Sequence, residues 1–469
     1  MLSRDQDPPA LEVMRSGVLP HLVTHLMAHD APKLQFEAAW ALTNIASTDH
    51  THAVADAGAV GPMVQLMKSP HADVREQCMW CLGNVAGDGH ELRDMVLNAP
   101  GAIEGIVLNL KNPATPSLLR NATWTMSNFC RGKPLPPLEL IRPALSTLVE
   151  IAQCKDAEVV SDACWALSYI SDGSNERIEA IVECGAVAVL TRLLQYHAAQ
   201  GSSKASIVTP TLRALGNIVT GSDSQTQAVL DAGAIPAFCS VLNHPKQVVR
   251  KETCWALSNV AAGTKEQVEA LISVPGMMGE VVRIMGEGAY QVAKEACWIL
   301  TNICTGGEKK HVLHVVENGG VKALCDKLRE MDPKVTESLL DALEAILTKC
   351  GTENTERLTV MIDECGGIDA LEELQQHENQ RVYDKAITMV EKWFGAEEDE
   401  EDAENSFAPN IEATSGGGAA FGFGCGAPAT PTCAPASAAG GFSFGAVAAA
   451  PPAAPSIAAA PAFAGFSFS

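Results

Sequence analysis

The sequence predicts an all-α, right-handed solenoid of helical repeats that is followed by a disordered C-terminal tail. A motif of the form Trp-Ala-Leu-Thr-Asn begins at Trp40 and recurs, with substitutions, at spacings of 40 to 48 residues. A regular period of this size is the signature of stacked helical units. The chain of 469 residues is also 47% hydrophobic but only 5% aromatic, which is typical of Ala/Leu/Val-rich helices.

Each copy of the motif has one residue in what we name the Trp slot and another, four positions later, in the Asn slot. On a helix these two slots share a face with the position three residues before the Trp slot, because all three fall within about 60° of one another. The pairs are Trp40/Asn44, Trp80/Asn84, Trp124/Asn128, Trp165/Tyr169, Arg213/Asn217, Trp255/Asn259, Trp298/Asn302 and Asp341/Ala345.

The opposite face of the same helix carries the positions two and five residues after the Trp slot. Both are apolar in all eight copies, so this face is the predicted core. The Trp slot, in contrast, accepts Arg213 and Asp341, and a packed core does not take a charge and an indole at one position without a partner. We therefore predict that the Trp/Asn face is exposed and binds a partner, with packing between repeats as the simpler alternative.

Each unit begins with a short helix, continues through a Gly and an apolar run such as residues 63–67, and ends in the long helix that carries the motif. Three helices in roughly 42 residues is the armadillo pattern. We assign residues 1–16 to a truncated N-terminal segment and residues 17–395 to the repeats. Residues 354–395 form a closing repeat without the Trp/Asn pair, so they are expected to cap the solenoid.

The predicted disordered tail is residues 396–469, an acidic run followed by a stretch rich in Gly, Ala, Pro and Ser. Phe-Gly clusters begin at Phe421, Gly441 and Gly465. They are candidates for weak contact with hydrophobic pockets, and a plain solubilising tail is the alternative.

The charge balance favours a basic partner. The formal net charge is −23, and no Lys or Arg follows Lys392. This field disfavours nucleic acid as a partner. The 15 cysteines are scattered singly and no secretory signal precedes them, which indicates reduced thiols in the cytoplasm or nucleus. No apolar run reaches membrane-spanning length, so we expect no membrane partner.

Chemistry of the enzymatic kind is not predicted. Cys78 and Cys81 have the spacing of a metal or redox pair, but no second pair accompanies them. Residues 88–91, Asp-Gly-His-Glu, lack a partner motif, and the chain has no nucleophile elbow, phosphate loop or zinc helix. We expect no metal, no cofactor and no enzymatic activity.

The residue types on the Trp/Asn face suit an extended, Lys/Arg-rich peptide. Neighbouring indoles form slots for the aliphatic stem of a Lys or Arg and attract its charge. The Asn carboxamide carries both a donor and an acceptor for a peptide backbone. Tyr169 and Arg213 interrupt the ladder and divide it into a longer N-terminal site and a shorter C-terminal site, and Arg213 is expected to hold a nearby acid. The acids expected to receive the ligand's cations are Asp88, Asp162, Glu252 and Glu295.

From about residue 10 to about residue 408 the chain resembles importin-α, the armadillo adaptor of nuclear import. The resemblance is carried by Trp-Ala-Leu-Thr-Asn-Ile-Ala-Ser at residues 40–47, the run from Leu119 to Lys133, Cys-Trp-Ala-Leu-Ser-Tyr at 164–169, Leu-Gly-Asn-Ile-Val-Thr-Gly at 215–221 and Asp-Glu-Cys-Gly-Gly-Ile-Asp at 363–369. Even Tyr169 and Arg213 match the family's irregular copies.

The resemblance implies a nuclear import adaptor that binds the nuclear localisation signals of cargo and shuttles between cytoplasm and nucleus. It also implies importin-β as a partner, and an export receptor that contacts the last repeats and the acidic segment. A non-import armadillo scaffold that binds other extended peptides is the alternative. The major site would comprise Trp40, Asn44, Gln77, Trp80, Asn84, Asp88, Asn121, Trp124, Asn128 and Asp162, and the minor site Arg213, Asn217, Glu252, Trp255, Asn259, Glu295, Trp298 and Asn302.

Two departures from the family pattern carry further expectations. Family members begin with a basic segment that binds importin-β and folds back onto the groove, whereas residues 1–36 here hold only Arg4, Arg15 and Lys33. Either the sequence is a fragment or it is a variant without autoinhibition, and as written it should bind cargo constitutively and recruit importin-β poorly. The Phe-Gly tail is longer than the family terminus and is a candidate for contact with transport receptors or nucleoporins.

Overall fold

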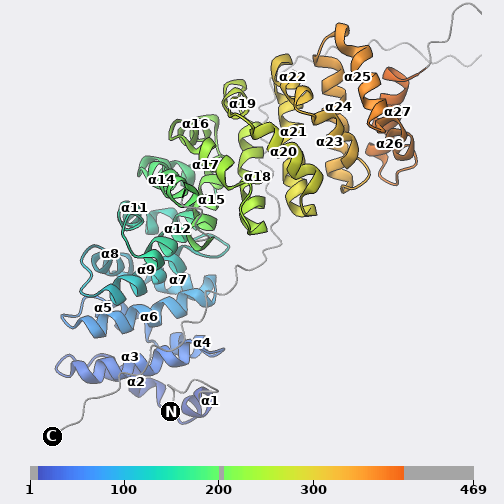
Figure 1. Ribbon diagram of the computed structural model, residues 1–469. Helices are drawn as coiled ribbons and strands as arrows, with labels where there is room; N and C mark the ends of the chain where they lie inside the picture. The colour runs from blue at the N-terminus through green and yellow to red at the C-terminus, as the bar shows by residue number, and fades with distance from the viewer. Residues whose placement is uncertain (1–8, 200–204, 396–469) are drawn as a thin grey trace, which may run out of the picture.

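The computed structural model describes residues 9–199 and 205–395, and within these ranges it contains helices and no strands. The helices form one curved row from α1 to α27, as the change from blue to orange in Figure 1 shows. They fall into nine units of three, which confirms the predicted armadillo solenoid. The predicted tail lies outside the described residues.

The first helix of each unit is short, and most of the second helices are short as well. The first helices are α1 (Ala10–Arg15), α4 (Thr51–Asp56), α7 (His90–Asn98), α10 (Leu138–Ile141), α13 (Asn175–Glu183), α16 (Asp223–Asp231), α19 (Lys265–Ile272), α22 (Lys309–Glu317) and α25 (Thr352–Glu364). The second helices are α2 (Leu19–Leu26), α5 (Val60–Leu66), α8 (Ala102–Lys111), α11 (Leu145–Ile151), α14 (Ala186–Ala199), α17 (Ala234–Val241), α20 (Met277–Glu287), α23 (Gly320–Lys327) and α26 (Gly367–Leu374). A 3₁₀ turn, η1 (Arg142–Ala144), joins α10 to α11.

The third helices of the first eight units carry the Trp and Asn slots, and each of these packs on the third helix of the next unit. Their stacking therefore brings the slots of successive repeats side by side on one surface, which we name the ladder face. These helices are α3 (Pro32–Ala46), α6 (Ala72–Asp88), α9 (Pro116–Cys130), α12 (Ala157–Ser171), α15 (Ala205–Ile218), α18 (Gln247–Ala261), α21 (Tyr290–Gly306), α24 (Pro333–Lys349) and α27 (Gln380–Trp393).

Glycines make the turn between the first and second helices in eight of the nine units. Gly17 and Gly58 are typical, with φ of 74° and 83°, a left-handed conformation that costs glycine little. Residue 17 is the predicted start of the repeats. Helix α1 precedes Gly17, so the first unit begins earlier than predicted. The fourth unit uses Pro143 in η1 in place of the glycine, as predicted.

The hydrophobic core follows the two apolar positions of the third helices. Leu42 and Ile45 in α3, for example, have no exposed surface. All sixteen residues at these positions are 1% exposed or less, which confirms the predicted core face and turns the Trp and Asn slots away from it. The further members are Leu82, Val85, Met126, Phe129, Leu167, Ile170, Leu215, Ile218, Leu257, Val260, Leu300, Ile303, Leu343 and Ile346.

Candidate peptide-binding ladder

The tryptophans of the ladder face are neither fully exposed nor part of the core. Trp40, at the N-terminal end, is 39% exposed, and the other five in the Trp slots are half-buried. For Trp124 and Trp255 the reason is packing of the indole on the preceding repeat. A Cβ atom on Gly83 would lie 2.4 Å from Cζ3 of Trp124, and one on Gly216 would lie 2.4 Å from Cζ3 of Trp255. One side of such an indole is therefore covered, and the other remains available to a ligand.

The position three residues after the Trp slot thus supports the indoles of the site, and it was not among the predicted site residues. It holds Gly, Ser or Thr in seven of the eight copies, and at Gly83 and Gly216 a larger side chain would displace the indole of the next repeat. This shared small size is the signal that would have revealed it. The residues are Thr43, Gly83, Ser127, Ser168, Gly216, Ser258 and Thr301.

The asparagines connect each repeat to the preceding one. Nδ2 of Asn128 donates to the carbonyl oxygen of Gly83 at 3.1 Å, and Nδ2 of Asn302 donates to that of Ser258 at 2.9 Å. Asn84 and Asn217 make the equivalent bonds, to Thr43 at 3.4 Å and to Ser168 at 3.0 Å. This recurring bond fixes the orientation of the carboxamide and occupies one of its N–H donors.

Two of these asparagines correct the prediction of an exposed ladder. Asn128 and Asn217 are only 5% and 8% exposed, because their side chains lie in the seam between two third helices. Asn259 differs again, since its Nδ2 donates to the carbonyl oxygen of Trp255 in its own helix at 3.0 Å. Asn44 is half-buried.

Two further residues assigned to the major site hold neighbouring repeats together. Gln77 is buried, and its Nε2 donates to Oγ1 of Thr43 at 2.8 Å. Nδ2 of Asn121 donates to Oε1 of Glu76 at 2.8 Å. The prediction that both side chains are open to a ligand is therefore wrong for Gln77 and needs qualification for Asn121, which is half-buried.

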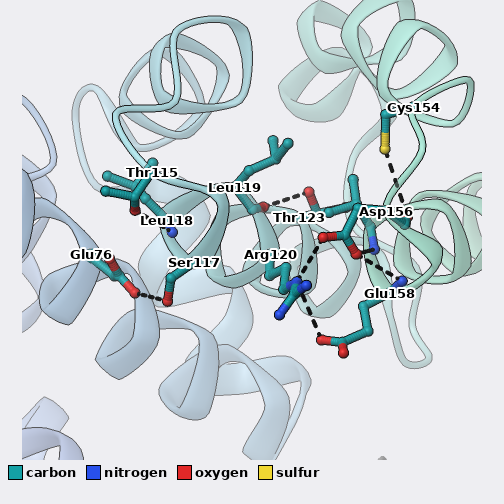
Figure 2. Close-up of polar contacts among 11 residues, drawn as sticks. Glu76, Thr115, Ser117, Leu118, Leu119, Arg120, Thr123, Cys154, Asp156 and Glu158 are labelled. Atoms are coloured by element: carbon teal, nitrogen blue, oxygen red, sulfur yellow. Dashed lines mark hydrogen bonds and ion pairs between the residues drawn. The ribbon is translucent and has the colours of Figure 1, made fainter. Parts of the chain in front are cut away.

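Figure 2 shows one edge of the ladder, where residues near the N-terminal ends of α6, α9 and α12 contact one another. The hydroxyl of Ser117 donates to Oε1 of Glu76 at 2.5 Å. Nε of Arg120 lies 2.8 Å from Oδ2 of Asp156 and 3.6 Å from Oε2 of Glu158. Asp156 also accepts from the first backbone N–H groups of α12, so it caps that helix while it pairs with Arg120.

The acids of the ladder fall into two groups. Asp162 and Glu295 are half-buried and have no hydrogen-bond or ion-pair partner in residues 9–199 and 205–395. Burial, helped by the charge of Glu158, raises the pKa of Asp162 to about 7. Burial also raises the pKa of Glu295, although Lys251 and Lys294 oppose it. Each carboxyl group is therefore partly desolvated and lacks a direct ion pair, which a ligand cation would supply.

The other two acids already have neighbours. Glu252 is 5% exposed, and its Oε1 lies 2.8 Å from Nη2 of Arg213. Arg213 thus holds an acid, as predicted, but that acid is one assigned to the minor site. Asp88 is exposed at the end of α6, with Oδ2 3.5 Å from Nε2 of His52.

The centre of the ladder is closed by the protein itself. The guanidinium of Arg213 lies over the ring of Trp165, 5.8 Å from its centroid. Tyr169 stacks on the same indole with ring centroids 5.6 Å apart. Trp165 lies between the two predicted sites and belongs to neither of the assigned residue sets, yet it is the aromatic platform on which the internal cation lies.

The ladder is therefore two open segments separated by a filled one. We name Trp40, Trp80 and Trp124, with their asparagines and Asp162, the first segment. We name Trp255, Asn259, Glu295, Trp298 and Asn302 the second segment. Each combines half-buried indoles with an unpaired carboxyl group, an arrangement that suits an extended ligand with Lys or Arg side chains.

The remaining observations concern metal clusters, membrane-spanning helices and the Cys78/Cys81 pair. There, no cluster of three or more His, Cys, Asp or Glu is arranged to hold a metal ion, and no helix has the length and apolar character to span a membrane. Cys78 and Cys81 are fully buried, which raises the pKa of both thiols, that of Cys81 to about 12. A neutral buried thiol is a poor nucleophile and a poor metal ligand.

The chain matches known proteins over most of its length. Residues 6–47, 47–87, 133–172, 174–220 and 222–262 match the armadillo/beta-catenin-like repeat, and residues 356–409 match the atypical Arm repeat. Importin subunit alpha-1b of Oryza sativa subsp. japonica is 41% identical over 95% of this chain and 80% of its own length. Importin subunit alpha-2 of Arabidopsis thaliana is 45% identical over 85% of this chain and 75% of its own length.

The solved structures agree on the fold. The crystal structure of an engineered protein superposes with a TM-score of 0.73 at 28% identity, covering 82% of this chain and 91% of that one. The extent and identity of the importin matches go well beyond a shared repeat architecture. The chain belongs to the importin-α family, the armadillo adaptors of nuclear import.

Proposed function

We propose that this importin-α protein binds Lys/Arg-rich nuclear localisation signals of cargo along its ladder face, for importin-β-dependent transport through the nuclear pore. The observation that carries the proposal is the pair of half-buried carboxyl groups, Asp162 and Glu295, which have no ion-pair partner in the described residues and lie on the face that carries the half-buried indoles. A basic side chain would compensate both and gain contact with the tryptophans.

The spacing of the ladder suits an extended peptide. Neighbouring helices pack about 8–10 Å apart, and an extended chain rises about 3.3 Å per residue. Each repeat therefore meets about three ligand residues. The carboxamide oxygens of the half-buried Asn slots, such as Asn302, can accept backbone N–H groups from the ligand without reading its sequence.

The first segment is the stronger candidate for the principal site. It has three consecutive Trp/Asn pairs, whereas the second segment has two and borders the Arg213–Glu252 ion pair. We propose that the assigned residues of both sites bind the peptide, except for Gln77. Because Gln77 is buried and bonds to Thr43, it would support the interface between repeats and not contact the ligand.

The further partners follow from family membership. Importin-β and signal-bearing cargo are the general partners of importin-α proteins. For this chain we propose in addition an export receptor that contacts the last repeats, shuttling between cytoplasm and nucleus, and contact of the Phe-Gly tail with transport receptors or nucleoporins. Like its family, the protein would act as an adaptor and not as an enzyme.

The test is a titration of a fluorescent Lys/Arg-rich peptide into the full chain and into a Trp80→Ala/Asn84→Ala variant. We expect the double substitution to weaken binding at least about tenfold, since it removes an indole wall and an ordered carboxamide together. A matched control is Tyr196→Ala, which removes an aromatic side chain that is 58% exposed on α14, outside the ladder.

An acidic peptide of equal length distinguishes the alternative of a non-import scaffold. Preference for the basic peptide supports the proposal, and binding of the basic peptide should weaken as salt rises, because ion pairs on a partly exposed face are screened. Preference for the acidic peptide, or equal loss in the control variant, would overturn it.

A further inference from the structure

The C-terminal end of the ladder face has lost its aromatic and amide residues. In α24 the Trp slot holds Asp341 and the Asn slot holds Ala345. Glu337 and Glu344 lie four residues before and three residues after Asp341, so the three carboxylates share one side of the helix. An acidic surface thus continues the ladder by one repeat beyond Trp298 and Asn302.

The last helix, α27, supplies two lysines to these acids. Nζ of Lys385 contacts Oδ1 of Asp341 and lies 3.9 Å from Oε1 of Glu337. Nζ of Lys392 lies 3.0 Å from Oε1 of Glu344. Each of the three acids therefore has an ammonium group from the chain itself, unlike Asp162 and Glu295.

The surroundings of Lys385 resemble a ligand slot. A hollow of about 140 Å³ lies between α24 and α27, with apolar surface from Leu340 and Met389 and charge from Asp341, Glu344 and Asp384. Apolar walls beside carboxylates are what the stem and head of a ligand lysine require. Here the side chain of Lys385 lines the hollow and pairs with Asp341, and Lys392 pairs with Glu344.

A cation of the chain also pairs with an acid at the centre of the ladder. There Arg213 lies over Trp165 and pairs with Glu252. Internal cations thus lie on both sides of the second segment, whose own acid, Glu295, has no ion-pair partner within residues 9–199 and 205–395.

We propose that Lys385 and Lys392 set the C-terminal limit of the peptide site, by occupying the carboxylates of α24 that a further lysine of the ligand would otherwise use. The proposal rests on the proposed function of the ladder face. It follows that removing the two ammonium groups opens a third slot in the second segment and lengthens the bound peptide by about three residues.

The test compares peptide lengths in a Lys385→Gln/Lys392→Gln variant of the full chain. The Trp80→Ala/Asn84→Ala substitutions are present throughout, so that the first segment does not dominate the signal. One peptide carries two basic residues spaced for the second segment, and two others extend it by three residues, including one lysine, at either end. We expect the variant to bind one extended peptide about fivefold tighter than the parent peptide, against less than about twofold without the lysine substitutions.

Lys310→Gln/Lys322→Gln is the matched control. It removes the same charge, but these lysines pair with Glu269 and Asp326 away from the ladder face. We expect no length dependence in this control. The proposal is overturned if the ratio of affinities for the extended and parent peptides is the same with and without Lys385 and Lys392. A gain of the same size in the control variant also overturns it.

Further measurements distinguish three causes of a negative result: misfolding of the variant, failure of the proposed function, and failure of this inference alone. A Lys385→Arg/Lys392→Arg variant keeps both charges and should show no length dependence, and helix content by circular dichroism checks that α27 is retained. If the chain with an intact first segment binds no basic peptide, the proposed function fails and this inference with it. If that chain binds but the length dependence never appears, only this inference fails.

Discussion

The first and second segments are built from the same residue types, Trp and Asn, yet the charged groups around them differ. Asn128 bonds to Gly83 in the first segment as Asn302 bonds to Ser258 in the second, but Asp162 of the first segment has no ion-pair partner in the described residues. The second segment is bordered by Arg213 on Glu252 and by Lys385 on Asp341. The shared motif therefore gives a similar arrangement of indoles, while the protein's own cations determine how much negative charge remains for a ligand.

The largest expected difference between the segments is the effect of removing one tryptophan from each. Trp124→Ala should weaken binding of a short Lys/Arg-rich peptide about 30-fold, and Trp255→Ala about threefold. Both indoles lie on a glycine of the preceding repeat, so the substitutions leave similar cavities and the contrast reports on the ligand. Fluorescence anisotropy measures both, and equal losses would show that the internal cations do not rank the segments.

The next effect is a pH dependence that arises in the first segment. Burial raises the pKa of Asp162 to about 7, so at pH 6 the carboxyl group is mostly protonated and must lose its proton to pair with a ligand cation. The affinity for an Arg-rich peptide without His should therefore rise about tenfold from pH 6 to pH 8. Isothermal titration at both pH values measures it.

Asp162→Asn provides the control for this pH dependence. The variant should bind more weakly at pH 8 and show a flat profile across the same range. A profile of unchanged slope in the variant would assign the dependence to another group, of which Glu295, whose pKa burial also raises, is the first to examine.

A smaller effect is expected when the internal cation of the centre is removed. Arg213→Gln leaves Glu252, which is 5% exposed, without its cation, so the free protein should lose stability. A basic peptide should then bind the second segment about fivefold tighter, since it can replace the missing charge. Arg213→Gln/Glu252→Gln should recover stability without this gain, and a gain in both variants would contradict the charge argument.

The fold could be predicted from sequence because its constraints recur within each repeat. Positions such as Leu42 and Ile45 are apolar in every copy, and the spacing of the copies fixes the helical unit. The assignment of the family needed no more than this period and the quoted motifs. The face that turns away from the core was equally well defined by the same helix geometry.

The partners of individual site residues could not be predicted, because they lie a full repeat away in sequence. Nδ2 of Asn84 bonds to Thr43, 41 positions earlier, and Lys385 contacts Asp341, 44 positions earlier. Which side chains meet depends on the register between stacked helices, and a motif within one helix carries no information about it. The burial of Asn128 and Glu252 was missed for this reason.

The smallest expected effect concerns an ion pair at the edge of the ladder, and it shows why position matters more than charge. Arg120 bridges α9 to Asp156 and Glu158 as Arg213 bridges α15 to Glu252, but its side chain is 48% exposed and Glu158 is 65% exposed (Figure 2). Water already solvates these groups, so Arg120→Gln should cost only about 0.5 kcal/mol in the free energy of unfolding and leave peptide affinity within about twofold. Urea denaturation and the peptide titration measure the two quantities. A loss of affinity as large as that from Trp124→Ala would mean that the ligand reaches this edge and that the first segment is wider than its indoles.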